Sequence, residues 1–469
     1  MGRELCIRGT FAHTQQLGEF EIFHDHLLIT NSFGVTTHFE AATSAQSQAQ
    51  LAAQSSVTLP SGHFILPNFV DLHLHAPQFL YQGNGLHLPL MQWLDEYAFK
   101  AEERLDADPA LARKVYTRLA HRLIQHGTGT VLFFGTIKEE TNLILAQVMQ
   151  NAGLRAFVGK LSMDMSSRPS YMESSTQTSL QAARSFVKKC RDLTSTLPQH
   201  ERLVEPVLTP RFVPTCSDEL LLGLGKLSAA ESLKIQSHFA EAMDQVEFVR
   251  RQRGAEDIDV FDRASSGLLT SRTIQAHCTF LDLPSFQHVR SCRTAIAHCP
   301  LSNSYFSAEP FRLREALDEG VKVGLGTDIA GGYSLDIMNS MRHAVSVSRM
   351  RQGSKDIITG TAGDGSKSLA IDWKESLYLA TKGGATALGL TTGAFAVGSP
   401  FDAQEIGLFD SNGSGVGAID IFDAEELGSA QLSVTMEMVE KWWCLGDTRN
   451  RVRTWVQGAK LDSEISPLL

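Results

Sequence analysis

Features of secreted and membrane proteins are scarce in this sequence. The cysteines are few and widely spaced, and no two of them form a Cys-x-x-Cys pair. The seven are Cys6, Cys190, Cys216, Cys278, Cys292, Cys299 and Cys444. An odd number at such spacing argues against a disulfide framework and predicts free thiols. The sequence contains no run of about 18 apolar residues, so no membrane span is predicted. The first residues lack the apolar core of a signal peptide. We therefore expect a cytoplasmic protein with no membrane partner.

An excess of basic residues is also missing. Lys and Arg together number 42 and Asp and Glu 52, which gives a formal net charge of −10. A surface that binds a nucleic-acid backbone needs clustered positive charge. The charge balance therefore predicts no nucleic-acid partner and leaves a small molecule as the expected ligand.

What the sequence does contain is a regular alternation of strand-like and helix-like segments. Eight apolar runs of strand length occur between residues 69 and 328. They are Phe69–His75, Thr130–Gly135, Ala156–Met163, Glu205–Thr209, Leu233–His238, Thr273–His277, Ala295–His298 and Val321–Asp328. Between the first two, Asp108 before Pro109 predicts a helix start and Gly127 a helix end. Eight strand–helix units predict an α/β fold, a parallel (β/α)₈ barrel of the TIM type.

Both ends of the chain have a different pattern. Residues 1–40 and those after about 395 contain short apolar runs separated by turn residues, which are typical of small β-strands. We predict that residues 1–66 and 392–469 pair into one small accessory β domain and that residues 67–391 form the barrel. Residues 41–58 are rich in Ala, Gln and Ser and carry no charge. This composition predicts a mobile loop insertion.

Polar side chains stand where several predicted strands end. His73 and His75 close the first strand, and because strand side chains alternate they lie on one face. The fifth strand ends at His238, the sixth at His277 and the eighth at Asp328. In barrels of this type the carboxyl ends of the strands carry the active site. We therefore expect these side chains to converge.

The chemistry that this set supports is metal-assisted hydrolysis. A catalytic zinc ion takes few protein ligands, keeps one position for water and lowers the pKa of that water. Glu241, three residues after His238, is placed to move protons. A single histidine at a strand end is more often structural, and only the ordered set predicts a metal site. His298 lacks a partner in this pattern and is predicted to be structural.

With these motifs the sequence resembles the amidohydrolase superfamily and, within it, the guanine deaminases. The matching segments are DLHLHAPQF, LPLMQWLDEYAFKAEER, TPRF, QSHFAEAMDQVE, AHCTFL, AIAHCPLSN, GLGTDIAGGYS and LGDTRN. The resemblance covers the barrel and reaches the C-terminal segment. It implies that guanine and water are converted to xanthine and ammonia with one Zn²⁺ per chain, and it suggests a homodimer.

Roles for individual residues follow from the resemblance. It implies zinc ligation by His73, His75, His238 and Asp328. It implies catalytic roles for Glu241, Asp328 and His277, with Glu241 shuttling protons and His277 orienting water or substrate. It implies substrate binding by Gln78, Arg211, Phe212, Trp93 and Leu94. Arg donates hydrogen bonds to purine acceptors, Gln offers a donor and an acceptor, and Phe stacks on a flat base. The alternatives are core packing for Phe212 and a loop salt bridge for Arg211.

Three other functions compete with this interpretation. The same barrel serves deaminases and dechlorinases of other aminated or halogenated rings, and fold alone does not choose between them. A non-catalytic scaffold relative is disfavoured because the predicted ligands and Glu241 are all present. An editing deaminase would need a Pro-Cys-x-x-Cys motif, which is absent. The fourth strand, in EPVLTPRF, has no lysine to bridge two metals, which favours one metal. Lys160 on the third strand is predicted to be structural or to support the site residues from behind.

Overall fold

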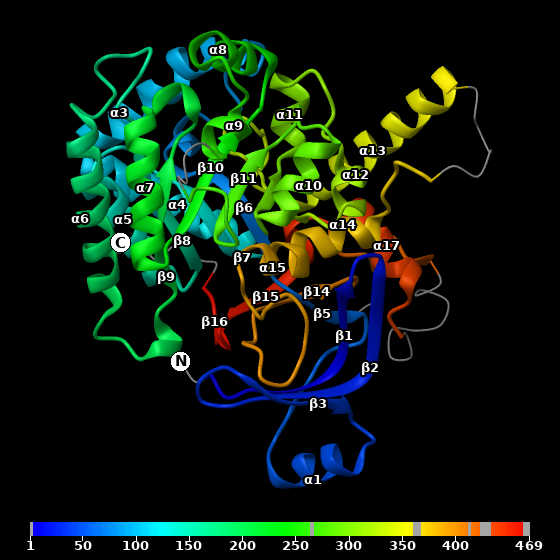
Figure 1. Ribbon diagram of the computed structural model, residues 1–469. Coiled ribbons are helices and arrows are strands. Elements are labelled where there is room, and N and C mark those ends of the chain that lie inside the picture. Colours follow the sequence, from blue (N-terminus) through cyan, green and yellow to red (C-terminus); the bar gives the residue numbers. More distant parts are fainter. Residues whose placement is uncertain (1–2, 263–266, 360–366, 411–413, 423–432, 463–469) are drawn as a thin grey trace.

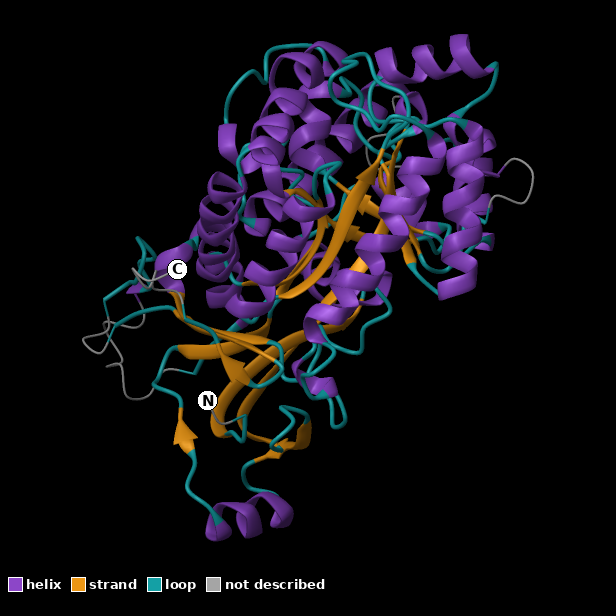
Figure 2. Cartoon of the chain, turned by 90° about the vertical axis from the view of Figure 1, so that its left-hand side faces the viewer, coloured by secondary structure: helices purple, strands orange, loops and turns teal. Residues whose placement is uncertain are grey.

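The computed structural model describes residues 3–262, 267–359, 367–410, 414–422 and 433–462 (Figure 1). Two eight-stranded sheets organise these residues. One is entirely parallel and is surrounded by helices, and the other lies beside it and is mainly antiparallel (Figure 2). The first is the predicted barrel and the second is the predicted accessory sheet.

The barrel strands follow one another in chain order, each parallel to the next. They are β6 (Phe69–His75), β7 (Thr128–Phe134), β8 (Arg155–Ser162), β9 (Val204–Pro210), β10 (Lys234–Phe239), β11 (Thr273–His277), β12 (Ala295–His298) and β13 (Lys322–Leu325). The eight predicted strands are confirmed, although the last ends at Leu325 rather than Asp328. The first strand, β6, meets the segment that follows the last strand, β13. There the Asp328 N–H donates to the His73 carbonyl at 2.8 Å, and the His75 N–H donates to the Ile329 carbonyl at 3.1 Å. These hydrogen bonds close the barrel at its carboxyl end.

Helices cover the barrel from outside (Figure 1). The longer ones are α3 (Phe99–Ala107), α4 (Pro109–Gln125), α5 (Glu139–Ala152), α6 (Thr176–Thr194), α7 (Asp218–Glu231), α8 (Met243–Arg253), α10 (Leu283–Ser291), α13 (Ile337–Thr359) and α17 (Met436–Leu445). Shorter ones are α2 (Leu90–Trp93), α9 (Asp257–Asp262), α11 (Pro300–Phe306), α12 (Leu313–Asp318), α14 (Trp373–Tyr378) and α15 (Gly384–Ala387). The predicted start of α4 is confirmed, since the Asp108 side chain accepts from the Leu111 N–H at 3.0 Å. Gly127, with φ of 71°, follows its end.

Strands from both ends of the chain form the accessory sheet. They are β1 (Cys6–Gln16), β2 (Glu19–Thr30), β3 (Thr36–Ala41), β4 (Val57–Thr58), β5 (His63–Pro67), β14 (Ala403–Gly407), β15 (Arg451–Val456) and β16 (Ala459–Lys460). The link between the two ends is β5, which pairs with β1 on one side and with β14 on the other. The chain then passes directly from β5 into β6 of the barrel. The accessory sheet therefore holds the first barrel strand at its amino end.

The segment 41–58 differs from the prediction. Residues Ala45–Ala53 form helix α1, and the Ser44 hydroxyl accepts from the Ser47 N–H as its cap. The Ser47 hydroxyl is buried and lies 2.8 Å from Nε2 of His38. The expectation of a loop is wrong here because Ala and Gln are good helix formers and Ser is a good N-cap, even without charge.

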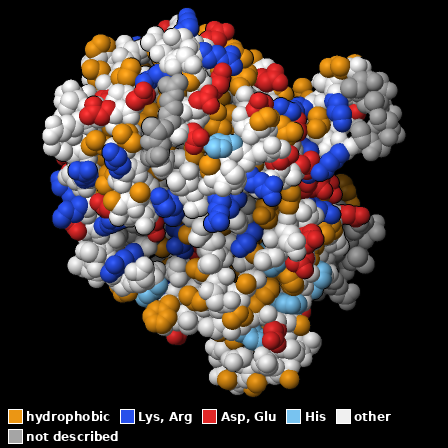
Figure 3. Space-filling model, viewed as in Figure 1, with side chains coloured by type: hydrophobic (Ala, Val, Ile, Leu, Met, Phe, Trp, Pro, Cys, Tyr) orange, Lys and Arg blue, Asp and Glu red, His pale blue; other side chains and the backbone are white. Residues whose placement is uncertain are grey.

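All seven cysteines are free, as predicted. Burial raises the pKa of the Cys190 and Cys216 thiols to about 12, so both are protonated and unreactive. In the described part of the chain, no helix combines the length and the apolar character needed to cross a membrane. Positive and negative side chains are interspersed over the face of the barrel seen in Figure 3.

A buried carboxylate at the junction of the two sheets generates a prediction. Asp402 accepts from the Arg155 guanidinium at 3.0 Å and from the Gln457 N–H at 2.7 Å. Its own carbonyl accepts from the Asn68 N–H at 3.1 Å. Asp402→Ala leaves Arg155 without its carboxylate, and we expect a loss of about 1.5–3 kcal/mol of stability. The urea midpoint, followed by circular dichroism, measures this loss.

The matched control is Asp192→Ala, because Asp192 pairs with Lys188 on an exposed helix surface at 2.6 Å. Exposed pairs of this kind contribute little, about 0.3–0.5 kcal/mol. Equal midpoints for the two variants would show that Asp402 does not hold the junction.

Candidate functional site

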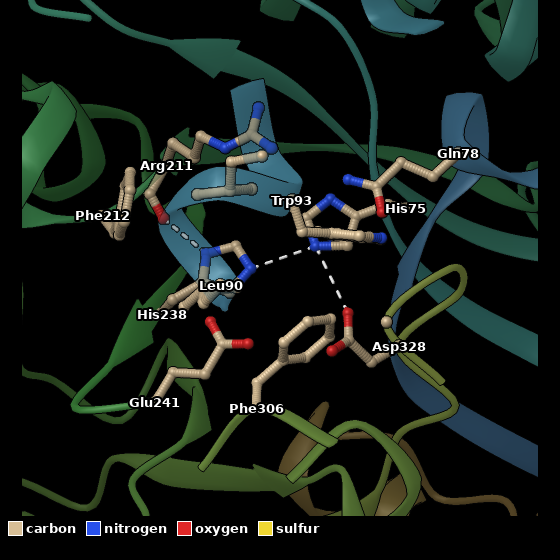
Figure 4. A pocket seen from close by; sticks show the side chains of 12 residues that line it. His75, Gln78, Leu90, Trp93, Arg211, Phe212, His238, Glu241, Phe306 and Asp328 are labelled. Atoms are coloured by element: carbon tan, nitrogen blue, oxygen red, sulfur yellow. Dashed lines mark hydrogen bonds and ion pairs between the residues drawn. The ribbon is translucent and has the colours of Figure 1, made fainter. Parts of the chain in front are cut away.

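A pocket opens at the carboxyl ends of the barrel strands (Figure 4). Its lining residues are His75, Gln78, Leu90, Trp93, Leu94, Arg211, Phe212, His238, Glu241, Phe306, Asp328 and Gly331. The predicted substrate-binding residues are therefore brought together with the predicted catalytic carboxylates. Both groups stand at the end of the barrel where barrel enzymes bind their substrates.

Three imidazoles converge at the base of this pocket. One ring nitrogen from each of His73, His75 and His238 lies within 4.8 Å of the other two. Nε2 of His75 is 3.0 Å from Nε2 of His238 (Figure 4). Burial lowers the pKa of all three well below its usual range, so the rings are neutral. Neutral imidazole is the form that binds metals.

Hydrogen bonding fixes which nitrogen of His238 faces the pocket. Its Nδ1 lies 2.6 Å from the carbonyl oxygen of Arg211. A carbonyl only accepts, so Nδ1 carries the proton and Nε2 keeps its lone pair. Nε2 of His73 is buried and has no hydrogen-bond partner among the described residues. The Nε2 lone pair of His238 is therefore directed into the site, and Nε2 of His73 has no hydrogen bond there among the described residues.

Two carboxyl groups stand beside the imidazoles. Oδ1 of Asp328 is 3.2 Å from Nε2 of His73 and 3.5 Å from Nε2 of His75. Oε2 of Glu241 is 3.5 Å from Nε2 of His277. Burial raises the pKa of both carboxyls, and the charge of Asp328 raises that of Glu241 further. A carboxyl whose pKa is raised in this way takes up a proton more readily than an exposed one.

The donor set fits a divalent metal ion. His73, His75 and His238 offer three neutral imidazoles, and Oδ1 of Asp328 lies 3.2 and 3.5 Å from two of them, a combination suited to zinc. Two further groups also have ligand atoms within 4.8 Å of one another, Glu241 with His277 and Asp328, and His73 with His277 and Cys299. Burial raises the pKa of the Cys299 thiol well above its usual range, which makes it a poor ligand.

Local structure explains how the ligands come together. Alternation along β6 directs His73 and His75 to one side. Asp328 lies just beyond β13 with φ of 50°, a left-handed conformation that Asp tolerates better than most residues. Gly326 allows the approach, since a Cβ there would lie 2.7 Å from Cβ of His73.

Asp71 is a residue to which the sequence assigned no role. Its buried carboxylate accepts from the Thr327 hydroxyl at 2.5 Å, the Thr327 N–H at 3.1 Å and the His73 N–H at 3.1 Å. Burial, partly offset by these bonds, raises the pKa of Asp71 to about 7. It fixes the backbone beside the ligands His73 and Asp328. The sequence signal that could have identified Asp71 was its place in the DLHLH segment, two residues before His73.

His277 is oriented by a second residue that the sequence analysis missed. Nδ1 of His277 lies 2.9 Å from Oδ1 of Asn303. An amide oxygen accepts, so Nδ1 donates and the Nε2 lone pair faces Glu241 and Asp328. The orientation needed to accept a hydrogen bond from water is therefore built in.

The other side of the pocket holds a buried ion pair. Arg211 contacts Glu102 twice, at 2.6 and 3.1 Å, and both side chains are at most 2% exposed. Nε2 of Gln78 donates to Glu102 at 3.2 Å, while its Oε1 accepts from the Ala330 N–H at 3.1 Å. Arg211 thus lines the pocket and also forms a salt bridge, the alternative considered for it. Glu102 was missed, although it lies in one of the resembling segments.

Aromatic and apolar side chains complete the walls. Phe212 lies at the pocket surface with its ring 6.2 Å from that of His238, and it also packs in the core. The rings of Trp93 and Phe306 are 5.1 Å apart. Phe306 and Leu90 were not expected in the lining. Lys160, expected to be structural, forms a buried ion pair with Glu173 at 2.7 Å.

Comparisons with known proteins agree with this geometry. Residues 64–458 match the amidohydrolase family. The chain is 35% identical to guanine deaminase of Homo sapiens over 462 residues, covering 97% of this chain and 96% of that protein. It is 34% identical to the Mus musculus guanine deaminase over 465 residues, covering 97% and 96%.

Solved structures share the fold. Guanine deaminase from C. acetobutylicum, with guanine bound in its active site, has a TM-score of 0.83 and 27% identity, covering 98% of this chain and 100% of that one. A triazine hydrolase from Arthobacter aurescens has a TM-score of 0.76 at 17% identity, covering 98% and 94%. At that identity the likeness concerns the fold alone.

The buried ion pair generates a prediction. Glu102→Ala removes the carboxylate from Arg211 and leaves its charge unpaired in the interior. We expect a loss of about 3–5 kcal/mol of stability. The thermal unfolding midpoint measures it.

Glu103→Ala is the matched control. Glu103 pairs with Arg168 at 2.5 Å, but both side chains are partly exposed. Its midpoint should fall much less, because exposed pairs contribute about 0–1 kcal/mol. If Glu102→Ala were as stable as Glu103→Ala, the pair would not hold Arg211 in place.

Proposed function

Because the chain belongs to the amidohydrolase family and, within it, to the guanine deaminases, we propose that it hydrolyses guanine to xanthine and ammonia. The observation that carries the proposal is one pocket lined by His75, His238 and Asp328 together with Glu241, Arg211 and Phe212, with a ring nitrogen of His73 within 4.8 Å of those of His75 and His238. The family resemblance supports a homodimer, which we propose together with a cytoplasmic location.

The metal in this proposal is one zinc ion, held by His73, His75, His238 and Asp328. When bound, zinc lowers the pKa of water and makes hydroxide available at neutral pH. The tautomer of His238, set by the Arg211 carbonyl, keeps a lone pair facing the site. The low pKa values of the three histidines mean that no proton has to leave before they bind metal.

Proton transfer falls to the residues around this point. Glu241 takes a proton from water and delivers it to a ring nitrogen of guanine, which we assign as N3. His277 accepts a hydrogen bond from the water through Nε2 and so orients it. Asp328 takes the second proton as the water oxygen bonds to C2. Asp328 passes this proton to the amino nitrogen, and the C2–N bond breaks. The amino group leaves as ammonia, and xanthine remains.

Recognition of guanine uses the opposite wall. Arg211 donates two hydrogen bonds to Glu102, whereas a guanidinium has five N–H donors. A remaining donor suits O6 or N7, the acceptors of guanine. Gln78 keeps a second amide N–H for the ring edge. Phe212 and Trp93 offer flat surfaces on which the base stacks, with Leu94 closing the apolar side.

The proton shuttle is tested with Glu241→Gln. Gln keeps the size of the side chain but cannot exchange a proton, so turnover should fall about 10²–10⁴-fold. Metal content should not change, because Glu241 is not a proposed ligand. The measurements are guanine absorbance loss with ammonia release, and metal analysis of the same sample. Glu247→Gln, at an exposed position on α8, is the control. Near-full activity of Glu241→Gln would remove Glu241 from the mechanism.

Base stacking is tested with Phe212→Leu. Arg211→Ala is less suitable, because the ion pair with Glu102 makes it a stability variant as well. Leu retains most of the apolar volume but not the flat ring, so kcat/KM for guanine should fall roughly tenfold. Phe157→Leu, buried outside the pocket, is the control. Equal kinetics for the two variants would place Phe212 in the core only.

A further inference from the structure

A second cavity of about 760 Å³ lies between α11 and α13, and it shares no lining residue with the guanine pocket. Helix α13 packs against α11 and then extends away from the barrel (Figure 1). Ligand-binding pockets commonly measure about 300–1,000 Å³. The cavity is therefore large enough for a ligand of the size of a nucleotide.

Two buried polar groups on the wall of this cavity have no hydrogen-bond partner in the part of the chain that the structure describes. Nδ1 of His298 and Nδ2 of Asn303 make no hydrogen bond within the described residues. His298 is 3% exposed and Asn303 is 4% exposed. Leaving such groups unsatisfied costs about 1–3 kcal/mol each, so each calls for an explanation. A ligand in the cavity would supply the missing partners.

The remaining walls indicate the chemistry of that ligand. The ring of Phe311 lies 4.9 Å from that of His298, at 34°, and offers a flat surface. From α13, Arg351 and Lys355 bring positive charge to the cavity, which has one lining carboxylate, Glu309. Arg351 also pairs with Glu315 at 2.7 and 2.9 Å, and Lys355 donates to the Lys367 carbonyl at 3.3 Å, so each brings only the N–H donors that these contacts leave. Burial lowers the pKa of His298 to about 3, so it is neutral and offers one donor and one acceptor. A planar ring with polar edges suits the buried end, and an anionic group suits the α13 side.

We propose that this cavity binds a purine mononucleotide, with the base against Phe311, His298 and Asn303 and the phosphate toward Arg351 and Lys355. The site is connected to the guanine pocket through Asn303, whose Oδ1 accepts from His277 at 2.9 Å. A ligand that accepts from Nδ2 of Asn303 strengthens this amide as a partner of His277. Bound nucleotide therefore alters the rate of guanine turnover. This effect rests on the function proposed above, whereas the binding of the nucleotide does not depend on that function.

Binding is measured by calorimetry on the full chain with guanosine 5′-monophosphate, guanosine and inorganic phosphate as separate probes. The mononucleotide should bind saturably, and more tightly than either of its parts. Val347→Trp fills the cavity from α13 and should abolish binding. Lys355→Glu should weaken it roughly tenfold through the phosphate. Ser346→Trp and Arg349→Glu lie on the same helix outside the lining and should bind as the unmodified chain does.

Several outcomes would overturn the proposal. Absence of saturable binding is one, and equal binding by Val347→Trp and Ser346→Trp is another. Loss of binding in Phe212→Leu but not in Val347→Trp would locate the nucleotide in the guanine pocket. Phosphate binding as tightly as the mononucleotide would exclude a role for the base. Calorimetry needs no turnover, so a chain inactive toward guanine still gives a decisive answer about the cavity.

Discussion

Closure of the barrel and assembly of the candidate metal site depend on one buried carboxylate, that of Asp71. It joins the first strand to the end of the last by accepting two hydrogen bonds from Thr327 and one from the His73 N–H. The neighbouring backbone bonds between Asp328 and His73 and between His75 and Ile329 complete the seam. A buried carboxylate is tolerated only when its hydrogen bonds are made. The seam that closes the fold is therefore also the place where three proposed ligands stand.

Around this seam, three side chains with proposed chemical roles are each oriented by a neighbour. The Arg211 carbonyl sets the tautomer of His238, while the Arg211 side chain lines the pocket. Asn303 sets the tautomer of His277, and Glu102 holds the Arg211 guanidinium. Such partners keep reacting groups in position before substrate arrives, which lowers the cost of reorganisation during the reaction. The same Asn303 connects the second cavity to this arrangement.

The parts of this account that the sequence predicted are those with local signals. Apolar runs and turn residues located the eight strands, and alternation placed His73 and His75 on one face. Asp71, Glu102 and Asn303 were missed because each acts through a partner distant in the chain. Glu102 and Arg211, for example, are 109 residues apart. Helix α1 was missed because its composition was taken for a loop, although Ser44 is an effective cap.

Zinc-edge X-ray absorption on the purified chain tests most directly whether barrel closure places four ligands around one metal. The account predicts one zinc per chain with only nitrogen and oxygen neighbours, at about 2.0–2.2 Å. A sulfur neighbour at about 2.3 Å would implicate Cys299 instead. That result, or a second metal nearby, would contradict the assignment of His73, His75, His238 and Asp328 as the ligand set.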